Sequence, residues 1–259
     1  MTSEMLLEVA GLHRRFGGLS AVDGLSFNVR EGEIVSLIGP NGAGKTTAFN
    51  VITGIYPPTD GDIRFASRSL VGLAPHRVCA CGIGRTFQNL RIFPNLTVRD
   101  NVLVGFTLAN RASLLSALVR LPSQRREEKR LNGEVDALLH LLGLAEFEGH
   151  LARNLAYGDQ RRVEIARALA AQPRMMMLDE PAAGMNPAEI EDLNRLIRRM
   201  RDELGKTILL VEHHMNLVMG ISDRVVVMDQ GRKIAEGTPQ EVKRDTSVIR
   251  AYLGSEADA

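Results

Sequence analysis

The sequence predicts an α/β fold with a mostly parallel sheet. Short apolar runs of strand length, Ile34–Gly39, Met175–Glu180 and the later run TILLVEH, alternate with segments of helical periodicity. Continuous apolar runs of this kind are typical of strands buried on both faces. The chain opens differently, with two segments, Leu6–Phe16 and Leu25–Arg30, that indicate an antiparallel pair. We therefore expect a parallel core preceded by an N-terminal antiparallel β subdomain.

Helices in the first half are located by their start and stop signals. One helix should run from Lys45 to about Thr53 and stop at Gly54. The following YPPTDGD segment is predicted to be a loop because it is rich in Pro, Asp and Gly. A long helical region is predicted from about Val98 to Leu142, starting at the capping pattern of Thr97 with Asp100. This region is expected to form an inserted α-helical subdomain.

The second half alternates more regularly. A helix should start at the capping pattern of Asn186 with Glu189. The run RVVVMDQGRKIAEG predicts a hairpin that turns near Gly231. Thr238 and Glu241 repeat the capping pattern and predict one last helix, over about 238–254.

Composition indicates an ordinary globular protein. The 259 residues are 44% hydrophobic and 24% charged, with a net charge of +1, which does not suggest a nucleic-acid partner. The N-terminus lacks the pattern of a signal peptide, and no stretch approaches the ~20 apolar residues of a membrane-spanning helix. Cys79 and Cys81 are too few for a zinc site and are expected to be reduced thiols. A cytoplasmic protein is expected.

The strongest motif is GPNGAGKT, from Gly39 to Thr46. It matches the phosphate-loop pattern in full and lies between an apolar strand and a helix. Glycines keep side chains away, so that backbone N–H groups and the helix N-terminus can surround phosphate oxygens. In such a loop Lys45 reaches the β- and γ-phosphates, and the Thr46 hydroxyl can bind Mg²⁺. A glycine-rich turn with a chance lysine does not explain these flanks, so a P-loop NTPase core is expected.

Two acids end the Met175–Glu180 strand. Asp179 is placed to hold Mg²⁺ beside the phosphate loop, and Glu180 is a candidate general base for the attacking water. A surface acid at a strand end is the alternative for Glu180. His213 follows the TILLVE run, but His214 beside it leaves the functional histidine ambiguous. Gln88, at the end of GRTFQ, has no meaning by itself.

Taken together, these pieces stand in the order of an ATP-binding cassette (ABC) ATPase, and the chain resembles that family from about Leu6 to Gly237. The resemblance implies that Phe16 stacks on adenine with Val22 packed beside it. It implies that Gln88 contacts Mg²⁺ and senses a membrane partner. It makes Glu180 the general base and His213 the histidine near the γ-phosphate.

The stretch LAYGDQ resembles the signature element of this family, usually LSGGQ. The resemblance implies that it binds the γ-phosphate of an ATP molecule held by a second subunit. Ala156 and Tyr157 replace the usual Ser-Gly, and Asn186 stands where an aspartate is usual. His214 also replaces an aspartate, a departure without a sequence-level explanation. The residues implied to contact ATP are Phe16, Val22, Gly39, Pro40, Asn41, Gly42, Ala43, Gly44, Lys45, Thr46, Thr47, Gln88, Ala156, Tyr157, Gly158, Asp159 and Gln160, and those implied to bind Mg²⁺ are Thr46, Gln88 and Asp179.

Several longer stretches are similar to one branch of the family, the LivG-type ATP-binding subunits of branched-chain amino acid importers. They are RRFGGLSAV, RTFQNLRIF, DEPAAGMNP, LVEHHMNLVMGISDRV and VIRAYLG, together with an insertion near 106–130. This resemblance implies an ATPase subunit that powers uptake of branched-chain or related hydrophobic amino acids. An exporter of lipid or lipopolysaccharide type, or a non-transport ABC ATPase, is the alternative.

The resemblance also implies organisation and partners. We expect one ABC ATPase domain over 1–259, with a core and β subdomain at about 1–88 and 160–240 and a helical subdomain at about 89–159. The implied partners are a second ATPase subunit, identical or related, two membrane permeases and, indirectly, a periplasmic binding protein. The chain would lie on the inner face of the cell membrane.

Overall fold

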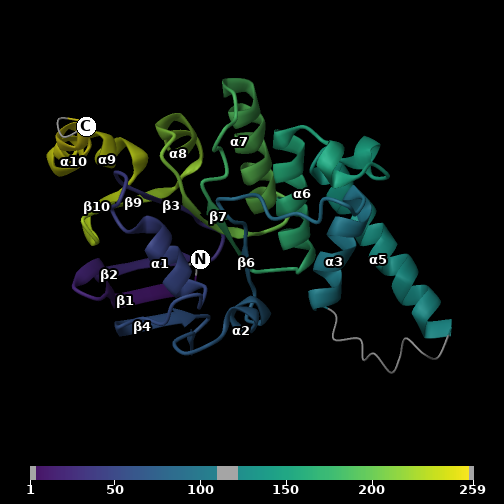
Figure 1. Ribbon diagram of the computed structural model, residues 1–259, viewed down its shortest axis with the longest axis horizontal. Coiled ribbons are helices and arrows are strands. Elements are labelled where there is room, and N and C mark those ends of the chain that lie inside the picture. Colours follow the sequence, from purple (N-terminus) through teal and green to yellow (C-terminus); the bar gives the residue numbers. More distant parts are fainter. Residues whose placement is uncertain (1–3, 110–121, 257–259) are drawn as a thin grey trace. The chain divides into compact units, whose positions relative to one another are not determined.

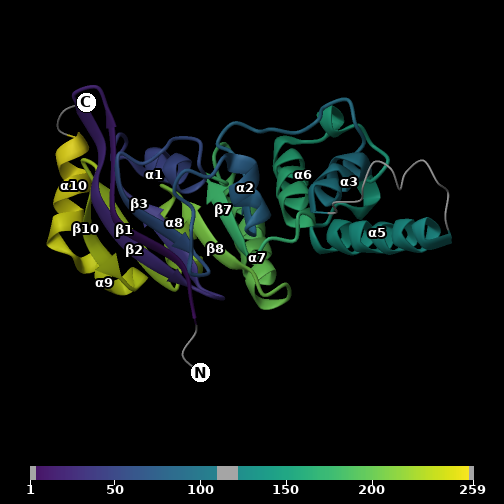
Figure 2. The same cartoon turned by 90° about the horizontal axis from the view of Figure 1, so that it is seen from below.

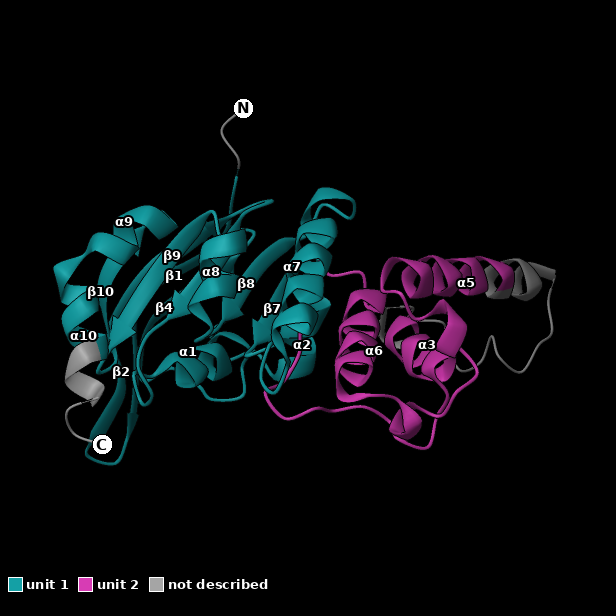
Figure 3. Ribbon diagram, turned by 90° about the horizontal axis from the view of Figure 1, so that it is seen from above, with its two compact units in different colours: residues 1–83, 174–259 teal, residues 84–173 magenta. Residues whose placement is uncertain are grey.

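A computed structural model describes residues 4–109 and 122–256, which form two compact units. The first comprises residues 1–83 and 174–259, and the second comprises residues 84–173 (Figure 3). The expected helical subdomain was placed at about 89–159, whereas this second unit is longer at both ends. Residues 110–121, within the insertion near 106–130, lie outside the described residues.

An antiparallel sheet opens the first unit, as predicted. Its strand order is β2-β1-β4-β5, and β1 pairs with both β2 and β4. The strands are β1 (Met5–Phe16), β2 (Leu19–Arg30), β4 (Asp60–Phe65) and β5 (Arg68–Ser69). The prediction of a loop through YPPTDGD was wrong at its end, because Asp60 starts β4. Pairing with β1 overrides the local turn composition, and Gly61 permits a close approach to the Gly11 carbonyl.

A mostly parallel sheet forms the core, with strand order β10-β9-β3-β8-β7-β6. Pairing of β3 with β8 and β9, and of β7 with β8, is parallel, whereas β10 returns antiparallel to β9 as the predicted hairpin. Every residue of β3, β7 and β8 is buried, which confirms the reading of the apolar runs. The strands are β3 (Ile34–Ile38), β6 (Ile83–Arg85), β7 (Met175–Asp179), β8 (Thr207–Val211), β9 (Arg224–Asp229) and β10 (Arg232–Gly237).

Alternate residues of the parallel strands point into different cores. Val35 and Leu37 face the antiparallel sheet and share a core with helix α1 (Lys45–Ile52), which lies between the two sheets (Figure 1). Ile38 belongs to a different core and packs with residues of the helices that follow β8 and β10. Figure 2 draws the last of these helices in yellow. The unit is therefore layered, and the loop after β3 lies at the junction of the layers.

The remaining helices of this unit are α2 (Pro75–Ala80), α7 (Pro187–Asp202), α8 (Met215–Ile221), α9 (Pro239–Arg244) and α10 (Thr246–Glu256). The predicted capping boxes of α7 and α9 are both present. The end of the chain differs from the expected single helix. Asp245 has extended backbone angles, and its carboxylate accepts a hydrogen bond from the Ser247 N–H at 2.8 Å, so a new helix starts there.

Helices make up most of the second unit: α3 (Val98–Ala109), α5 (Pro122–Leu141) and α6 (Tyr157–Ala170), with short 3₁₀ turns at Ala145–Phe147 and Ala152–Asn154. Thr97 caps α3 as predicted, since its Oγ1 accepts a hydrogen bond from the Asp100 N–H at 3.0 Å. Gly105 lets α3 approach α6 closely, because a Cβ there would lie 2.2 Å from the Arg167 carbonyl oxygen.

Candidate functional site

Three neighbouring parallel strands end at one level in the first unit. Val211 of β8 pairs with Leu37 of β3 on one side and with Asp179 of β7 on the other. The carboxyl ends of these strands carry the phosphate loop, the Glu212–His214 segment and the two predicted acids. Ligands of open α/β sheets bind outside the carboxyl ends of the strands. The topology therefore brings together candidate residues that lie far apart in sequence.

The phosphate loop is shaped by two close backbone contacts. A Cβ on Gly39 would lie 2.0 Å from the Met228 carbonyl oxygen, and one on Gly44 would lie 2.2 Å from that of Ala21. Neither position can hold a side chain without moving a strand. Gly231, at the tip of the β9–β10 hairpin, also donates its N–H to the Ala43 carbonyl at 3.0 Å. The loop is thus packed closely against β2 and β9 and bonded to the tip of the β9–β10 hairpin.

Lys45 starts α1 and is 7% exposed. Its Nζ donates hydrogen bonds to the carbonyl oxygens of Gly39 at 2.8 Å and Pro40 at 2.9 Å. Burial lowers the pKa of Lys45, while the carboxylates of Glu180 and Asp179 act in the opposite direction. Lys45 thus lies across the loop as a buried cation at the N-terminus of α1, where an anionic phosphate is favoured.

Asp179 and Glu180 differ in their surroundings. Asp179 is 1% exposed, whereas Glu180 is half-buried and has a φ of 46°, which is unusual for a non-glycine residue. The Glu180 N–H donates to the Val211 carbonyl at 2.9 Å, which fixes this turn at the strand end. The Thr46 hydroxyl and the Asp179 carboxylate are hard oxygen donors, so they suit Mg²⁺ chemically. Gln88, the third predicted Mg²⁺ ligand, belongs to the second unit.

The two histidines have different environments. The His214 ring lies 3.1 Å (Nδ1) from Oε2 of the buried Glu212, whereas the His213 ring lies 3.9 Å from it and is more exposed. The two ring centroids lie 4.4 Å apart, with the ring planes tilted by 34°. His214 is therefore tethered at the strand end, and the His213 ring is the more accessible of the two to a ligand.

Phe16 stands at the end of β1 and is 39% exposed. The Arg14 guanidinium lies 4.4 Å from its ring centroid, and Tyr56 contacts its edge with centroids 5.3 Å apart. Val22 is fully buried in the core, so its predicted contact with adenine rests on the resemblance alone. Sequence reasoning missed Arg14 and Tyr56, because no motif links Tyr56 to a residue forty positions earlier.

The signature stretch forms the N-terminus of α6 in the second unit. Ala156 is the N-cap, and no side chain in the described ranges caps the helix. Gln160 instead folds back, and its Nε2 donates to the Leu155 carbonyl at 2.9 Å. Asp159 lies 3.5 Å from Arg162. The first turn of the helix therefore keeps backbone N–H groups at its end, where an anion is favoured.

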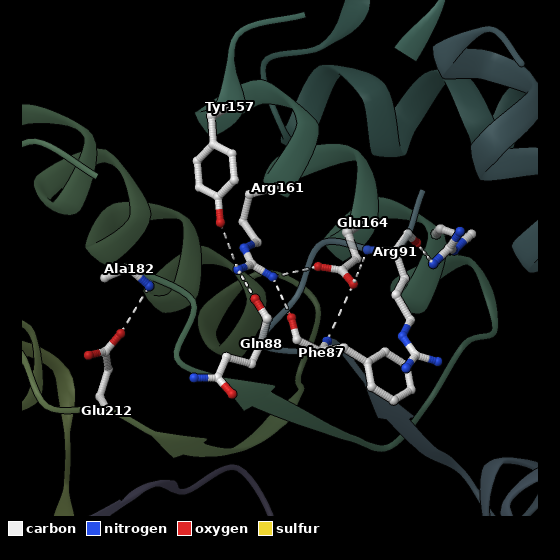
Figure 4. A network of polar contacts seen from close by, with 9 residues as sticks. Phe87, Gln88, Arg91, Tyr157, Arg161, Glu164, Ala182 and Glu212 are labelled. Carbon is white, nitrogen blue, oxygen red and sulfur yellow. Dashed lines mark hydrogen bonds and ion pairs between the residues drawn. The ribbon is translucent and has the colours of Figure 1, made fainter. Parts of the chain in front are cut away.

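Figure 4 shows a buried ion pair behind this helix start. Arg161 is 0% exposed, and its Nη1 lies 2.7 Å from Oε2 of Glu164, which is 1% exposed. Arg161 also donates to the carbonyl oxygens of Phe87 at 2.6 Å and Gln88 at 2.9 Å. The pair thus fastens the segment that carries Gln88 to the signature helix. No motif in the sequence indicated this role for Arg161.

Comparison with known proteins identifies the class. The family model described as "ABC transporter" matches residues 22–183. The chain belongs to the ABC transporter family and is an ABC ATPase, as its site geometry also indicates. In the described ranges, no helix is both long and apolar enough to cross a membrane.

Individual relatives indicate which members of this family the chain is similar to. The model described as "Branched-chain amino acid ATP-binding cassette transporter" matches residues 232–258. The chain is 50% identical to the high-affinity branched-chain amino acid transport ATP-binding protein LivG of Salmonella typhimurium, over 97% of this chain and 99% of LivG. It is 48% identical to BraF of Pseudomonas aeruginosa, with the same coverage. It is 35% identical to the lipopolysaccharide export protein LptB of Escherichia coli, over 96% of this chain and 98% of LptB.

Solved structures agree with the fold. The ADP conformation of MJ1267, an ATP-binding cassette of an ABC transporter, has a TM-score of 0.83 and 31% identity, over 97% of this chain and 100% of that one. The dimeric structure of MJ0796, a bacterial ABC transporter cassette, has a TM-score of 0.74 and 26% identity, over 90% of this chain and 99% of that one.

The phosphate loop offers a matched test of backbone crowding. Gly42 and Gly44 both have positive φ, of 80° and 97°, so an alanine at either should cost about 1–2 kcal/mol in backbone strain. A Cβ at Gly42 meets nothing within 4 Å in the described part of the chain, whereas one at Gly44 meets the Ala21 carbonyl. Gly44→Ala should therefore lower the free energy of unfolding more than Gly42→Ala, measured by urea titration without nucleotide. Equal losses would contradict this packing.

The buried ion pair makes a second prediction. Glu164→Ala leaves the Arg161 guanidinium buried without its carboxylate, which should cost about 3–5 kcal/mol. Glu203→Ala removes an exposed partner of Arg199, 2.7 Å away, and should leave stability almost unchanged. Urea unfolding followed by circular dichroism compares the two. A loss at Glu164 no larger than that at Glu203 would show that the pair is not needed.

Proposed function

We propose that this chain is the ATP-hydrolysing subunit of an importer of branched-chain or related hydrophobic amino acids. The observation that carries the hydrolytic part is the meeting of the phosphate loop, Asp179–Glu180 and His213 at the ends of three adjacent strands. Similarity to LivG and BraF, and the match of residues 232–258, support the amino acid substrate. Export of lipopolysaccharide is the second candidate, supported by a lower identity of 35% to LptB.

Each site residue has a proposed task. Lys45 and the loop amides bind the β- and γ-phosphates of ATP, and Phe16 stacks on the adenine. Thr46, Asp179 and Gln88 hold Mg²⁺, which would neutralise phosphate charge. Glu180 accepts a proton from the attacking water, and its half-buried position in the same unit as Lys45 suits that role.

A second ATPase subunit would complete the site. The N-terminus of α6, with Gly158 in its first turn, offers backbone N–H groups and a helix dipole to the γ-phosphate of ATP held by a partner. The dimeric structure of the similar cassette MJ0796 supports this arrangement. Two permeases and, indirectly, a periplasmic binding protein are the other proposed partners. The chain would then sit on the cytoplasmic face of the membrane, as one ABC ATPase domain.

Transport in proteoliposomes tests the proposal. The chain is combined with the permeases and the binding protein encoded by neighbouring genes, and uptake of labelled leucine is measured with ATP inside the vesicles. Uptake that needs ATP supports the importer. ATPase activity that lipopolysaccharide stimulates, without leucine uptake, would favour the exporter instead.

The general base is tested by a change that keeps its size. Glu180→Gln removes the anion, so turnover should fall by at least about 100-fold while ATP binding is kept. Lys45→Ala should instead weaken the binding of a fluorescent ATP analogue, because Lys45 is the cation that lies across the loop. Steady-state hydrolysis and equilibrium binding are measured for both variants. Parent-rate hydrolysis by Glu180→Gln would assign the base to another group.

A further inference from the structure

Glu212 is a fully buried carboxylate at the end of β8, directly after Val211. It lies between the strand ends that carry the phosphate loop and the two acids. Burial of a carboxylate is costly unless its oxygens accept hydrogen bonds. The partners of those oxygens therefore indicate what the residue does.

One oxygen holds the loop that follows Glu180. Oε1 accepts the Ala182 N–H at 2.9 Å, as Figure 4 shows. Ala182 is also fully buried, and the next residue, Ala183, donates its N–H to the Glu180 carbonyl at 3.2 Å. The bond to Ala182 thus fixes the tight turn in which Glu180 has its unusual positive φ.

The other oxygen holds the histidine segment. Oε2 accepts the N–H groups of His213 at 2.8 Å and His214 at 3.0 Å, and it lies 3.1 Å from Nδ1 of the His214 ring. The backbone that carries the His213 ring is therefore bonded to the same carboxylate as the turn of Glu180. This contact also accounts for a histidine at position 214.

A cation site is the competing interpretation. The ligand atoms of Glu212, His213 and His214 lie within 4.8 Å of one another. Both Glu212 oxygens, however, already accept backbone N–H groups, and a metal ion would have to displace them. Hydrogen bonds from N–H groups to a carboxylate are about twice as strong as neutral ones. The geometry favours a role in holding the backbone.

We propose that Glu212 is a positioning residue that fixes the general base Glu180 and the His213 ring relative to each other. This inference rests on the proposed function, which assigns those two roles. A carboxylate is needed because both of its oxygens must accept. A glutamine in the same place would present its NH₂ group to N–H donors on one of the two sides, and one loop would be released.

The test separates positioning from folding. Glu212→Gln should lower kcat for ATP by about 10- to 100-fold, since small misplacements of reacting groups have effects of that size. The dissociation constant of a fluorescent ADP analogue should stay within about threefold, because the phosphate loop has its own supports. Glu212→Asp keeps the charge, but its side chain is one methylene too short to reach both loops. It should therefore also lower kcat while leaving the dissociation constant of the ADP analogue almost unchanged.

Glu33→Gln is the matched control. Glu33 lies at the opposite end of β3, and its Oε2 accepts the Arg30 N–H at 2.8 Å. The same change of carboxylate to amide there should leave kcat unaltered. Circular dichroism and the thermal midpoint establish that each variant is folded.

Three outcomes would overturn the inference: Glu212→Gln turning over within twofold of the parent, binding and kcat falling in parallel, or neither Glu212 variant folding. The last would make Glu212 a residue of the core alone. Glu180→Gln is measured alongside. If the parent hydrolyses no ATP, or Glu180→Gln hydrolyses at the parent rate, the proposed function fails. A parent-like Glu212→Gln beside an inactive Glu180→Gln defeats only the role of Glu212.

Discussion

The site depends on the parallel register of β3, β8 and β7. Because Val211 pairs with both Leu37 and Asp179, the three strands end at one level and project their next residues to the same edge of the sheet. The phosphate loop then leaves β3 between two carbonyl groups, those of Met228 and Ala21, that leave no room for a Cβ. A register shift of one residue in β8 would turn Glu212 and its neighbours to the opposite face. The placement of the candidate catalytic residues therefore follows from backbone pairing in a buried sheet.

The sequence was sufficient wherever a local pattern reports directly on structure. Largely apolar runs predicted β3, β7 and β8. Capping residues such as Asn186 and Thr238 marked helix starts, and the glycine spacing predicted a phosphate loop. The predictions that were wrong concern the boundaries of elements. β4 starts within a segment of loop composition because pairing with β1 outweighs local preference. Asp245 divides the last predicted helix because its carboxylate accepts a hydrogen bond from the Ser247 N–H.

Residues that act by holding others were invisible in the sequence. Arg161 and Glu164 look like a polar helix face, yet both are buried. Arg161 donates to the carbonyl oxygens of Phe87 and Gln88, and Glu164 accepts the Phe87 N–H. Glu212 looks like an acid at the end of a strand, yet its carboxylate accepts hydrogen bonds from the N–H groups of two loops. Tyr56 meets Phe16 only through tertiary packing. Such residues carry no motif, because each has at least one partner distant in sequence that only the fold brings close.

The proposed function requires that each ATP is bound by the phosphate loop of one chain and that its site is completed by the signature helix of another. Purified mixed dimers test it most directly, through the ATPase rate of two pairings. One joins a Gly158→Asp chain to a Lys45→Ala chain, and the other joins a parent chain to a chain with both changes. We expect activity in the first pairing, where one composite site is intact, and none in the second, where both sites are damaged. Activity in the second pairing and none in the first would contradict it, since the loop and signature would then act within one chain.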